Sequence, residues 1–318
     1  MKYPSVTIII PSYNSEKVIS LCLTGAASQN YPIGKYEVIV VDNYSTDKTR
    51  ELAKSFGAQV YLLKGKPSQG CAQRNLGAEK SKGEYVLFLD HDMEMSKNFL
   101  ENFAHDVNKT ENTIDAWYIP ERVIAGNDFF SKVRTFEKSI YDGTVINAAR
   151  IIKREKFDLT NDKYDPKLSN GPADWDMDIQ LRVLGCKFGT TSGFIYHHEE
   201  SLTFWKYVNK KRFWVSGIEL YKIKWRKKDI NIYNTVIKKQ LGFYYRFIGV
   251  FVENGKWRIL IPNIHLFLIT LMTKILVSLV YIFKKISLYP TYAGLQKQLS
   301  GVYTHLISFF ARSGCKPE

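Results

Sequence analysis

Short apolar runs alternate with longer amphipathic stretches through the first ninety residues of the chain. The runs are rich in β-branched and aromatic residues and predict strands at 6–10, 37–41, 60–63 and 85–89. Between them, apolar residues recur at helical spacing and predict helices near 18–23 and at 46–56 and 69–80. Strands that alternate with helices indicate an α/β fold with a mostly parallel sheet and helices on both faces.

Polar residues follow three of the predicted strands, at Pro11 to Asn14, at Asp42 and at Asp90 to Asp92. In a parallel sheet these strand ends meet at one edge, which is where ligands bind. Carboxylates at the edge of a core need a cation or several donors, so we expect a positive group beside Asp90 and Asp92. The chain has neither a G-x-G-x-x-G turn after the first strand nor a P-loop, so a bound phosphate would need a metal ion.

The last third of the chain differs from the rest in charge. The net charge is +14, and residues 202–318 hold 20 Lys and Arg against 4 Asp and Glu, whereas residues 1–201 hold 25 against 27. The basic excess flanks an apolar stretch from Ile259 to Phe283. An anionic membrane surface attracts such residues by about 1 kcal/mol each. We predict a catalytic domain at 1–202 and a basic, aromatic-rich, helical, membrane-associated region at 203–318.

The apolar stretch 259–283 has three interpretations. Its 25 residues are enough to span a bilayer. The run is interrupted by Pro262, Asn263, His265 and Lys274. A charge near the centre of a span costs about 3 kcal/mol, and a narrow polar stripe recurs at Thr270, Lys274 and Ser278. We favour a helix that lies in the membrane interface, with a spanning helix and a buried core helix as the alternatives.

The cysteines and the N-terminus favour a reducing compartment. The four cysteines lie far apart without a C-x-x-C pair, so the sequence indicates neither a zinc site nor a disulfide framework. The first apolar run has only five residues before Pro11, which is too short for a signal peptide. We therefore expect the protein at the cytoplasmic face of the cell membrane, either peripheral or spanning once.

Four segments together resemble glycosyltransferase family 2, the inverting GT-A enzymes that use nucleotide sugars. They read IIIPSYNSEK, EVIVVDNYSTDKT, GCAQRNLGAEKSKGEYVLFLDHDM and DWDMDIQLRVLG, and they cover roughly residues 4 to 200 in order. The resemblance implies a Rossmann-like GT-A fold and a nucleotide-sugar donor, with UDP as the expected nucleotide. The QxxRW signature of processive members is absent, which favours transfer of a single sugar.

The resemblance also assigns residues to the donor and the metal. Asp90-His91-Asp92 is the D-x-D motif, whose carboxylates would hold Mn²⁺ or Mg²⁺ against the donor phosphates. A strand-end histidine serves as a further ligand in many members, and His198 is the first choice here, with His197 second. For Asp42, a turn or helix-capping role is the alternative. The nucleotide-binding residues would be Pro11, Tyr13, Asn14, Asp42, Arg74 and Asp90.

The catalytic base should come from the segment that begins at Asp174. An inverting displacement needs a carboxylate that removes the proton of the acceptor hydroxyl. Many family members carry Glu-Asp-x-Asp-Leu where this chain has Trp175-Asp176-Met177-Asp178-Ile179, so Asp176 aligns with the base. Because Trp175 replaces the glutamate, Asp174 is the runner-up. Asp178 and Arg182, four residues apart on a predicted helix, are expected to pair with each other.

Three functions remain to be compared. The first is metal-dependent transfer of one sugar to a hydroxyl of a lipid-linked glycan or glycolipid. The second is transfer to a polyprenyl phosphate, which is already ionised and needs no base. The third is nucleic-acid binding by the basic C-terminal region. The chain carries no recognisable nucleic-acid module, so we expect no nucleic-acid partner.

Overall fold

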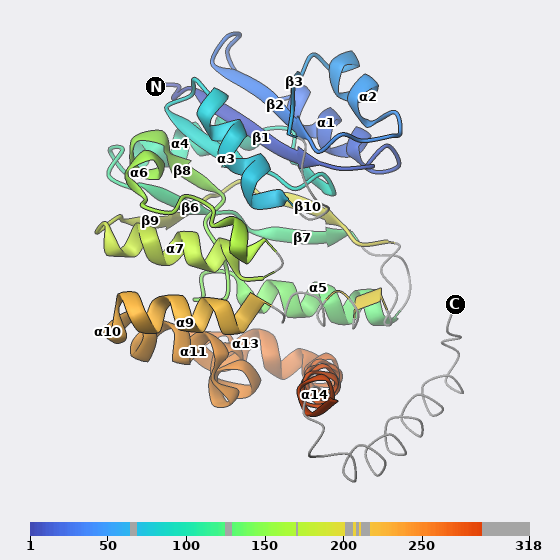
Figure 1. The fold of residues 1–318 in the computed structure, drawn as a ribbon, viewed down its shortest axis with the longest axis vertical. Coiled ribbons are helices and arrows are strands. Elements are labelled where there is room, and N and C mark those ends of the chain that lie inside the picture. The colour runs from blue at the N-terminus through green and yellow to red at the C-terminus, as the bar shows by residue number, and fades with distance from the viewer. Residues whose placement is uncertain are drawn as a thin grey trace.

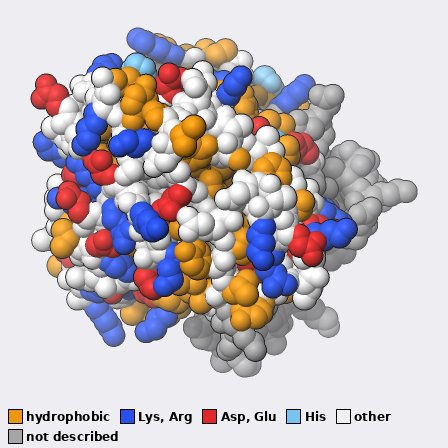
Figure 2. Space-filling model, turned by 90° about the horizontal axis from the view of Figure 1, so that it is seen from above, with side chains coloured by type: hydrophobic (Ala, Val, Ile, Leu, Met, Phe, Trp, Pro, Cys, Tyr) orange, Lys and Arg blue, Asp and Glu red, His pale blue; other side chains and the backbone are white. Residues whose placement is uncertain are grey.

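The protein is described here from a computed structural model. The structure describes residues 1–63, 69–124, 129–169, 171–200, 206–207, 210 and 217–287. In Figure 1 a strand-rich half carries the N-terminus, and a layer of helices from the C-terminal third lies on the far side of α5 and α7. On the face seen from above in Figure 2, acidic and basic side chains are interspersed over the strand-rich half.

The main sheet has seven strands in the order β3-β2-β1-β4-β8-β6-β9. All neighbours are parallel except β8, which is antiparallel to both β4 and β6. The α/β fold with a mostly parallel sheet that the sequence predicts is therefore confirmed. The strands are β1 (Val6–Ser12), β2 (Tyr36–Asp42), β3 (Gln59–Leu62), β4 (Tyr85–Phe88), β6 (Ala116–Tyr118), β8 (Ile151–Lys153) and β9 (Phe188–Thr190).

A second, smaller sheet has the order β5-β10-β7, with bounds Met93–Met95, Ile195–His198 and Glu121–Ile124. Strand β10 is antiparallel to β5 and parallel to β7. The register pairs His197 with Met93, and the backbone N–H of His198 donates to the carbonyl of Asp92 at 3.0 Å. The small sheet thus places β10 directly against the residues that follow β4.

Both faces of the main sheet are covered, which explains its continuous apolar runs. Ile8 and Ile10 of β1 belong to one core cluster, and Ile9 belongs to the other. The helices of the strand-rich part are α1 (Ile19–Ala27), α2 (Thr49–Ser55), α3 (Gly70–Lys80), α4 (Phe99–Lys109), α5 (Phe129–Tyr141), α6 (Arg154–Leu159), η1 (Pro166–Leu168) and α7 (Ala173–Val183).

The helices of the C-terminal third share a core with the sheet part. Tyr221 and Trp225 of α9 lie in the same buried cluster as Trp175 and Ile179 of α7. The domain boundary that the sequence predicts at 202 falls outside the described residues, as do 204–205 and 211–214. The helical segments are α9 (Ile218–Lys228), α10 (Ile230–Ile232), η3 (Tyr233–Ile237), α11 (Lys238–Leu241), η4 (Tyr245–Gly249), α12 (Val250–Val252), η5 (Glu253–Gly255), α13 (Trp257–Leu260), η6 (Ile261–Asn263) and α14 (Ile264–Ser287).

Helix α14 turns its polar side toward the protein. Thr270 is 1% exposed, and the Lys274 ammonium donates to the carbonyl of Arg246 at 2.7 Å. The apolar residues Ile264, Leu268, Met272 and Ile275 are each about half exposed. The segment Trp257–Leu279 is long and apolar enough to cross a membrane, and 17% of its apolar 18-residue window is buried among the described residues.

Helix α3 packs on the sheet through Gly77. A β-carbon at this position would overlap the Ile9 side chain and lie 3.3 Å from the Val41 side chain. We expect Gly77→Ala to lower the free energy of unfolding by about 1–3 kcal/mol through overpacking, measured by denaturant titration. Gly70→Ala in the same helix is the control, because its β-carbon would meet only Arg74, at 3.5 Å. Equal stability of the two variants would contradict this account of the packing.

Candidate active site

Two cavities meet beyond the carboxyl ends of β1 and β4. The first cavity, of about 320 Å³, is lined by residues of the β1 end, α3 and the segment 90–92. The second cavity, of about 280 Å³, lies between α5, α7 and η4. His197 and Lys210 line both, so the cavities are adjacent.

Asp90 is neutralised by two arginines. Arg74 of α3 lies 2.6 Å from one carboxylate oxygen, and Arg150, which precedes β8, lies 3.3 Å from the other. Burial opposes ionisation of Asp90, but Arg150 and Arg74 outweigh it and lower the pKa of the carboxyl. The positive group expected beside Asp90 is therefore a pair of arginines. The sequence reasoning missed Arg150, because nothing in the sequence shows that β8 inserts antiparallel beside β4.

Asp92 faces His197 across the junction of the cavities. The distance from Nε2 of His197 to the nearer Asp92 oxygen is 3.5 Å, and Nδ1 lies 3.2 Å from Glu121. Glu121 is held in turn by Lys138 at 2.5 Å and Arg150 at 3.1 Å. Nε2 of His197 is buried and has no hydrogen-bond partner among the described residues. A ring fixed by a carboxylate on one nitrogen presents the other nitrogen as a ligand.

His198, the first choice from the sequence, points away from this junction. Its ring nitrogens lie 2.9 Å from Glu94 and 3.0 Å from Glu200. Successive side chains of a strand point to opposite faces, so only one of two adjacent histidines can face Asp92. The structure places the runner-up, His197, in that position, and the order of preference is corrected accordingly.

A divalent metal ion fits between Asp92 and His197. No group of three or more His, Cys, Asp or Glu side chains in the described part of the chain could hold a metal by itself. The buried, unpartnered Nε2 and the adjacent carboxylate nevertheless offer two ligands on one side. Mn²⁺ and Mg²⁺ are commonly bound by few protein ligands, with phosphate oxygens and water completing the shell. The predicted ligand Asp90 is instead engaged by its arginines.

Four of the six predicted nucleotide-binding residues line the first cavity. They are Pro11, Tyr13, Arg74 and Asp90. Tyr13 is 44% exposed at this rim. Asn43, which the sequence reasoning did not select, also lines the first cavity.

The other two predicted residues shape the surrounding loops. Asp42 is fully buried, accepts from the backbone N–H of Ser45 at 2.8 Å and from the Ser45 hydroxyl, and lies 3.3 Å from the Ser12 hydroxyl. Asn14 has a φ of 45° and accepts from the backbone N–H of Thr46 at 2.8 Å. The structure thus favours the turn-capping alternative for Asp42 and gives Asn14 the same kind of role.

Asp176, the first choice for the base, is buried against the C-terminal helices. Its carboxylate accepts from Lys224 at 2.7 Å, from the indole of Trp225 at 2.8 Å and from Gln180 at 2.9 Å. Its side chain is 0% exposed, and it is not among the described residues that line either cavity. A fully satisfied carboxylate inside the core cannot reach an acceptor, so the structure contradicts this prediction.

Asp174, the runner-up, lines the second cavity beside Trp175, Arg150 and His197. Residues two apart on a helix point about 200° apart, because each residue turns the helix by about 100°. Because the side chain of Asp176 points into the core, the side chain of Asp174 points to the opposite side of α7, toward the cavity. The geometry favours Asp174 as the candidate base.

The predicted pair of Asp178 and Arg182 meets through a third residue. The Tyr118 hydroxyl donates to Asp178 at 2.8 Å and accepts from Arg182 at 2.8 Å. Burial raises the pKa of Asp178 to about 7. This cluster lies in the core and stabilises α7 against β6.

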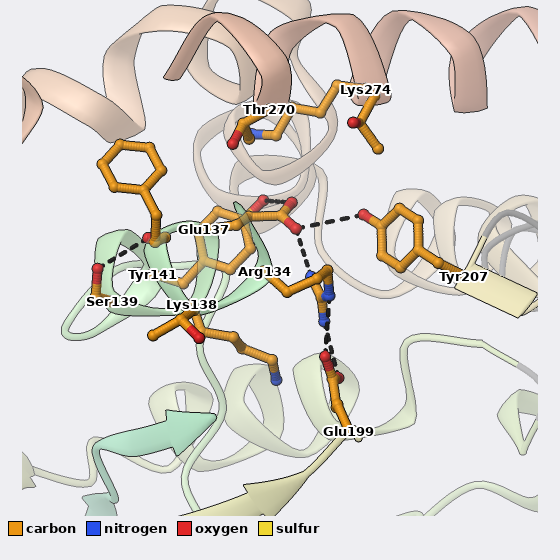
Figure 3. Close-up of polar contacts among 12 residues, drawn as sticks. Arg134, Glu137, Lys138, Ser139, Tyr141, Glu199, Tyr207, Thr270 and Lys274 are labelled. Atoms are coloured by element: carbon orange, nitrogen blue, oxygen red, sulfur yellow. Dashed lines mark hydrogen bonds and ion pairs between the residues drawn. The ribbon is translucent and has the colours of Figure 1, made fainter. Parts of the chain in front are cut away.

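The far wall of the second cavity is a buried ionic network on α5 (Figure 3). Arg134 donates to Glu199 at 2.9 and 3.1 Å and pairs with Glu137 one helical turn away. The Tyr207 hydroxyl donates to Glu137 at 3.4 Å. Because Glu199 directly follows β10, the network joins the strand that carries His197 to α5. The sequence reasoning missed it, since its members lie far apart in the chain.

The N-terminal half of the chain resembles known proteins in sequence. Residues 7–160 match the family model described as Glycosyl transferase family 2. The chain is 39% identical over 111 residues to the glycosyltransferase AglE of Haloferax volcanii. This match covers 34% of the chain and 36% of AglE, so the aligned part spans little more than a third of that relative.

Two solved structures share the fold. Staphylococcus aureus TarS 1–349 in complex with UDP superposes with a TM-score of 0.55 at 19% identity, over 77% of this chain and 72% of that chain. The mannosyltransferase PcManGT from Pyrobaculum calidifontis, in complex with GDP-Man and Mn²⁺, superposes with a TM-score of 0.56 at 18% identity, over 94% and 85%. The predicted GT-A arrangement of the sheet is confirmed.

The contrast between the two aspartates of α7 can be tested by stability. In Asp176→Asn the new amide group would point toward the donors of Lys224 and Gln180, which leaves buried groups unsatisfied. We expect the free energy of unfolding to fall by about 1–3 kcal/mol, measured by thermal or denaturant unfolding. Asp174→Asn is the control and should change stability little. The reverse order would contradict the assignment of Asp176 to the core.

Proposed function

The chain belongs to glycosyltransferase family 2 through residues 7–160, and from this premise we propose that it transfers one sugar from a nucleotide sugar, with UDP as the expected nucleotide, to a hydroxyl group. One observation carries the proposal. The first cavity holds Arg74 and the Asp92–His197 pair, and the adjacent second cavity holds the carboxylate of Asp174. A donor and an acceptor would therefore meet at the residues that line both.

The first cavity would bind the donor. Tyr13 and Pro11 offer apolar surface to the nucleobase. The guanidinium of Arg74, which pairs with Asp90, lines the same cavity. Asp92 and His197 would hold Mn²⁺ or Mg²⁺. Such an ion, when bound, neutralises the charge that develops on the departing nucleoside diphosphate. The structure of PcManGT in complex with GDP-Man and Mn²⁺ supports this part of the proposal.

The second cavity would bind the acceptor. Asp174 would take the proton of the attacking hydroxyl, which is the role that an inverting displacement requires. Arg150, which pairs with Asp90 at 3.3 Å, lines the second cavity together with Asp174. The indole of Trp175, which lines this cavity, is anchored by a hydrogen bond of 2.7 Å to the carbonyl of Ile146. A polyprenyl phosphate acceptor is the second candidate, because it would need no base.

The acceptor is proposed to be lipid-linked, because α14 suits a membrane surface. Its exposed stripe of Ile264, Leu268, Met272 and Ile275 is apolar, while its polar residues pack on the protein. An aqueous surface would favour the opposite orientation. The basic residues near this helix would add attraction to the anionic lipids of the cytoplasmic leaflet. We propose that the protein works there, with α14 lying in the interface.

The role of Asp174 predicts the behaviour of Asp174→Asn. A screen of UDP- and GDP-sugars for Mn²⁺-dependent release of the nucleoside diphosphate would identify the donor. With that donor and a hydroxyl acceptor, water included, the variant should be slower by about 10²–10⁴-fold, because the general base is lost. Binding of UDP with Mn²⁺, measured by calorimetry, should be unchanged.

The control is Asp176→Asn, assayed at a temperature at which it remains folded. It should keep most of the activity, since Asp176 lines neither cavity among the described residues. A normal rate of hydroxyl transfer in Asp174→Asn would contradict Asp174 as the base. Release of no nucleoside diphosphate from any nucleotide sugar by the wild type would refute the proposed function.

The membrane proposal predicts flotation with anionic vesicles. The double variant Leu268→Gln and Met272→Gln withholds about 1 kcal/mol of apolar burial per residue, so vesicle binding should weaken roughly thirtyfold. The control makes the same change at Leu21 and Leu62, which are equally exposed at 45% each on the strand-rich part. Tight binding of RNA or DNA without vesicle binding would instead support the nucleic-acid hypothesis.

A further inference from the structure

One arginine of the second cavity has no anionic partner. Arg246 lies in η4, a π-helical turn, and its guanidinium lies 5.0 Å from the centre of the Trp175 ring. Among the described residues, no carboxylate lies within ion-pair distance of this guanidinium, and no hydrogen bond of its nitrogens is present. Asp142 and Asp174 line the same cavity, yet neither pairs with it.

The other arginines and Lys138 in this wall are paired. Arg134 is engaged by Glu137 and Glu199, and Arg150 by Asp90 and Glu121. Lys138 is likewise engaged by Glu121. Lys210, at the junction of the cavities, resembles Arg246 in having no carboxylate partner among the described residues. Two cations with unused donors therefore face the same space.

The backbone of Arg246 is fixed by helix α14. Lys274 donates to its carbonyl at 2.7 Å, and the Lys274 ammonium lies 4.5 Å from the Phe251 ring and 5.3 Å from the Tyr141 ring. Figure 3 shows Lys274 reaching from α14 toward Glu137 and Tyr141. The backbone N–H of Arg246 donates to the carbonyl of Gly242 at 3.0 Å. The side chain thus starts from a held position, and π-helical turns are frequent at functional sites.

The chemistry of the side chain indicates what it binds. A guanidinium is a planar fork of five donors that matches the two oxygens of a carboxylate or the oxygens of a phosphate. Stacking on Trp175 leaves the edges of the fork, where the N–H groups lie, available to a ligand. Trp175 directly follows Asp174 in the chain, so an anion bound here would lie near the hydroxyl that Asp174 would deprotonate.

We propose that Arg246 and Lys210 form an anion subsite for the acceptor. The acceptor then carries a carboxylate or a phosphate close to the hydroxyl that receives the sugar. The inference rests on the proposed function, because it assumes that the second cavity binds the acceptor. The anionic oxygens could belong to a uronic acid of a glycan or to a phosphate ester, and both sources suit the same two side chains.

Paired probes test the subsite directly. With UDP and Mn²⁺ present to fill the first cavity, calorimetry compares methyl β-glucuronide with methyl β-glucoside, and glucose 6-phosphate with glucose. The anionic member should bind more tightly to the wild type. In Arg246→Gln that advantage should fall roughly tenfold or more, because a charge-assisted pair is lost. Arg246→Lys should retain part of it. The pair with the larger advantage identifies the source of the anion.

Arg226→Gln is the matched control. Arg226 also lies over an aromatic ring in the C-terminal helices, at 4.8 Å from the centre of the Tyr233 ring, and it carries the same charge. It is not among the described residues that line the second cavity, so its loss should leave both members of each pair unchanged. Lys210→Gln, an exposed position, provides a second variant that should lose the same preference if Arg246→Gln does not fold.

Two results would overturn the subsite. One is equal binding of the anionic and neutral probes by the wild type, and the other is an equal loss of both in Arg246→Gln, which would mean that Arg246 only packs on Trp175. Retained binding of UDP beside either result overturns the subsite and leaves the proposed function standing. An anion preference that depends on Arg246, in a protein that releases nucleoside diphosphate from no nucleotide sugar, supports the subsite and refutes the function.

Discussion

A chain of buried ion pairs fixes the geometry of this site. Arg150 joins Asp90 to Glu121, Glu121 holds the ring of His197, and the ring faces Asp92. The side chains of Arg150, Glu121 and His197 are 15%, 10% and 7% exposed, so removing a partner of one of them would leave an uncompensated charge in a largely buried place. The side chains at the junction of the two cavities are therefore held in one arrangement before any ligand enters.

The antiparallel strand of the main sheet makes this arrangement possible. Strand β8 runs opposite to β4, and the backbone N–H of Phe88 donates to the carbonyl of Arg150 at 2.8 Å. The start of β8 therefore lies beside the carboxyl end of β4, and Arg150 reaches Asp90. A parallel strand in the same place would deliver its first residues to the opposite edge of the sheet. One reversal of direction thus adds Arg150 to Arg74 as the second cation beside Asp90.

The sequence predicts the elements and the edge at which the site lies, and it fails where a side chain's direction decides the role. The apolar run before Asp90 is sufficient to place the acidic residues at a strand end. The choice between His197 and His198 depends on which face of β10 each side chain occupies. The choice between Asp174 and Asp176 depends on which side of α7 faces the cavity. Both are set by partners far away in the chain, Glu121 in one case and Lys224 in the other. Asp42 is a similar case, because its carboxylate is engaged by the backbone and hydroxyl of Ser45 in its own turn.

The C-terminal helices complete the second cavity, which the first two hundred residues cannot form by themselves. Lys224 and Trp225 of α9 hold Asp176 inside, which leaves Asp174 facing the cavity on the other side of α7. Lys274 of α14 holds the backbone of Arg246, whose side chain covers Trp175 in the same cavity. The helix that exposes an apolar stripe to its surroundings thus also fixes one wall of the second cavity. A surface that receives this stripe would hold that wall beside it, which is the arrangement that an acceptor anchored in lipid requires.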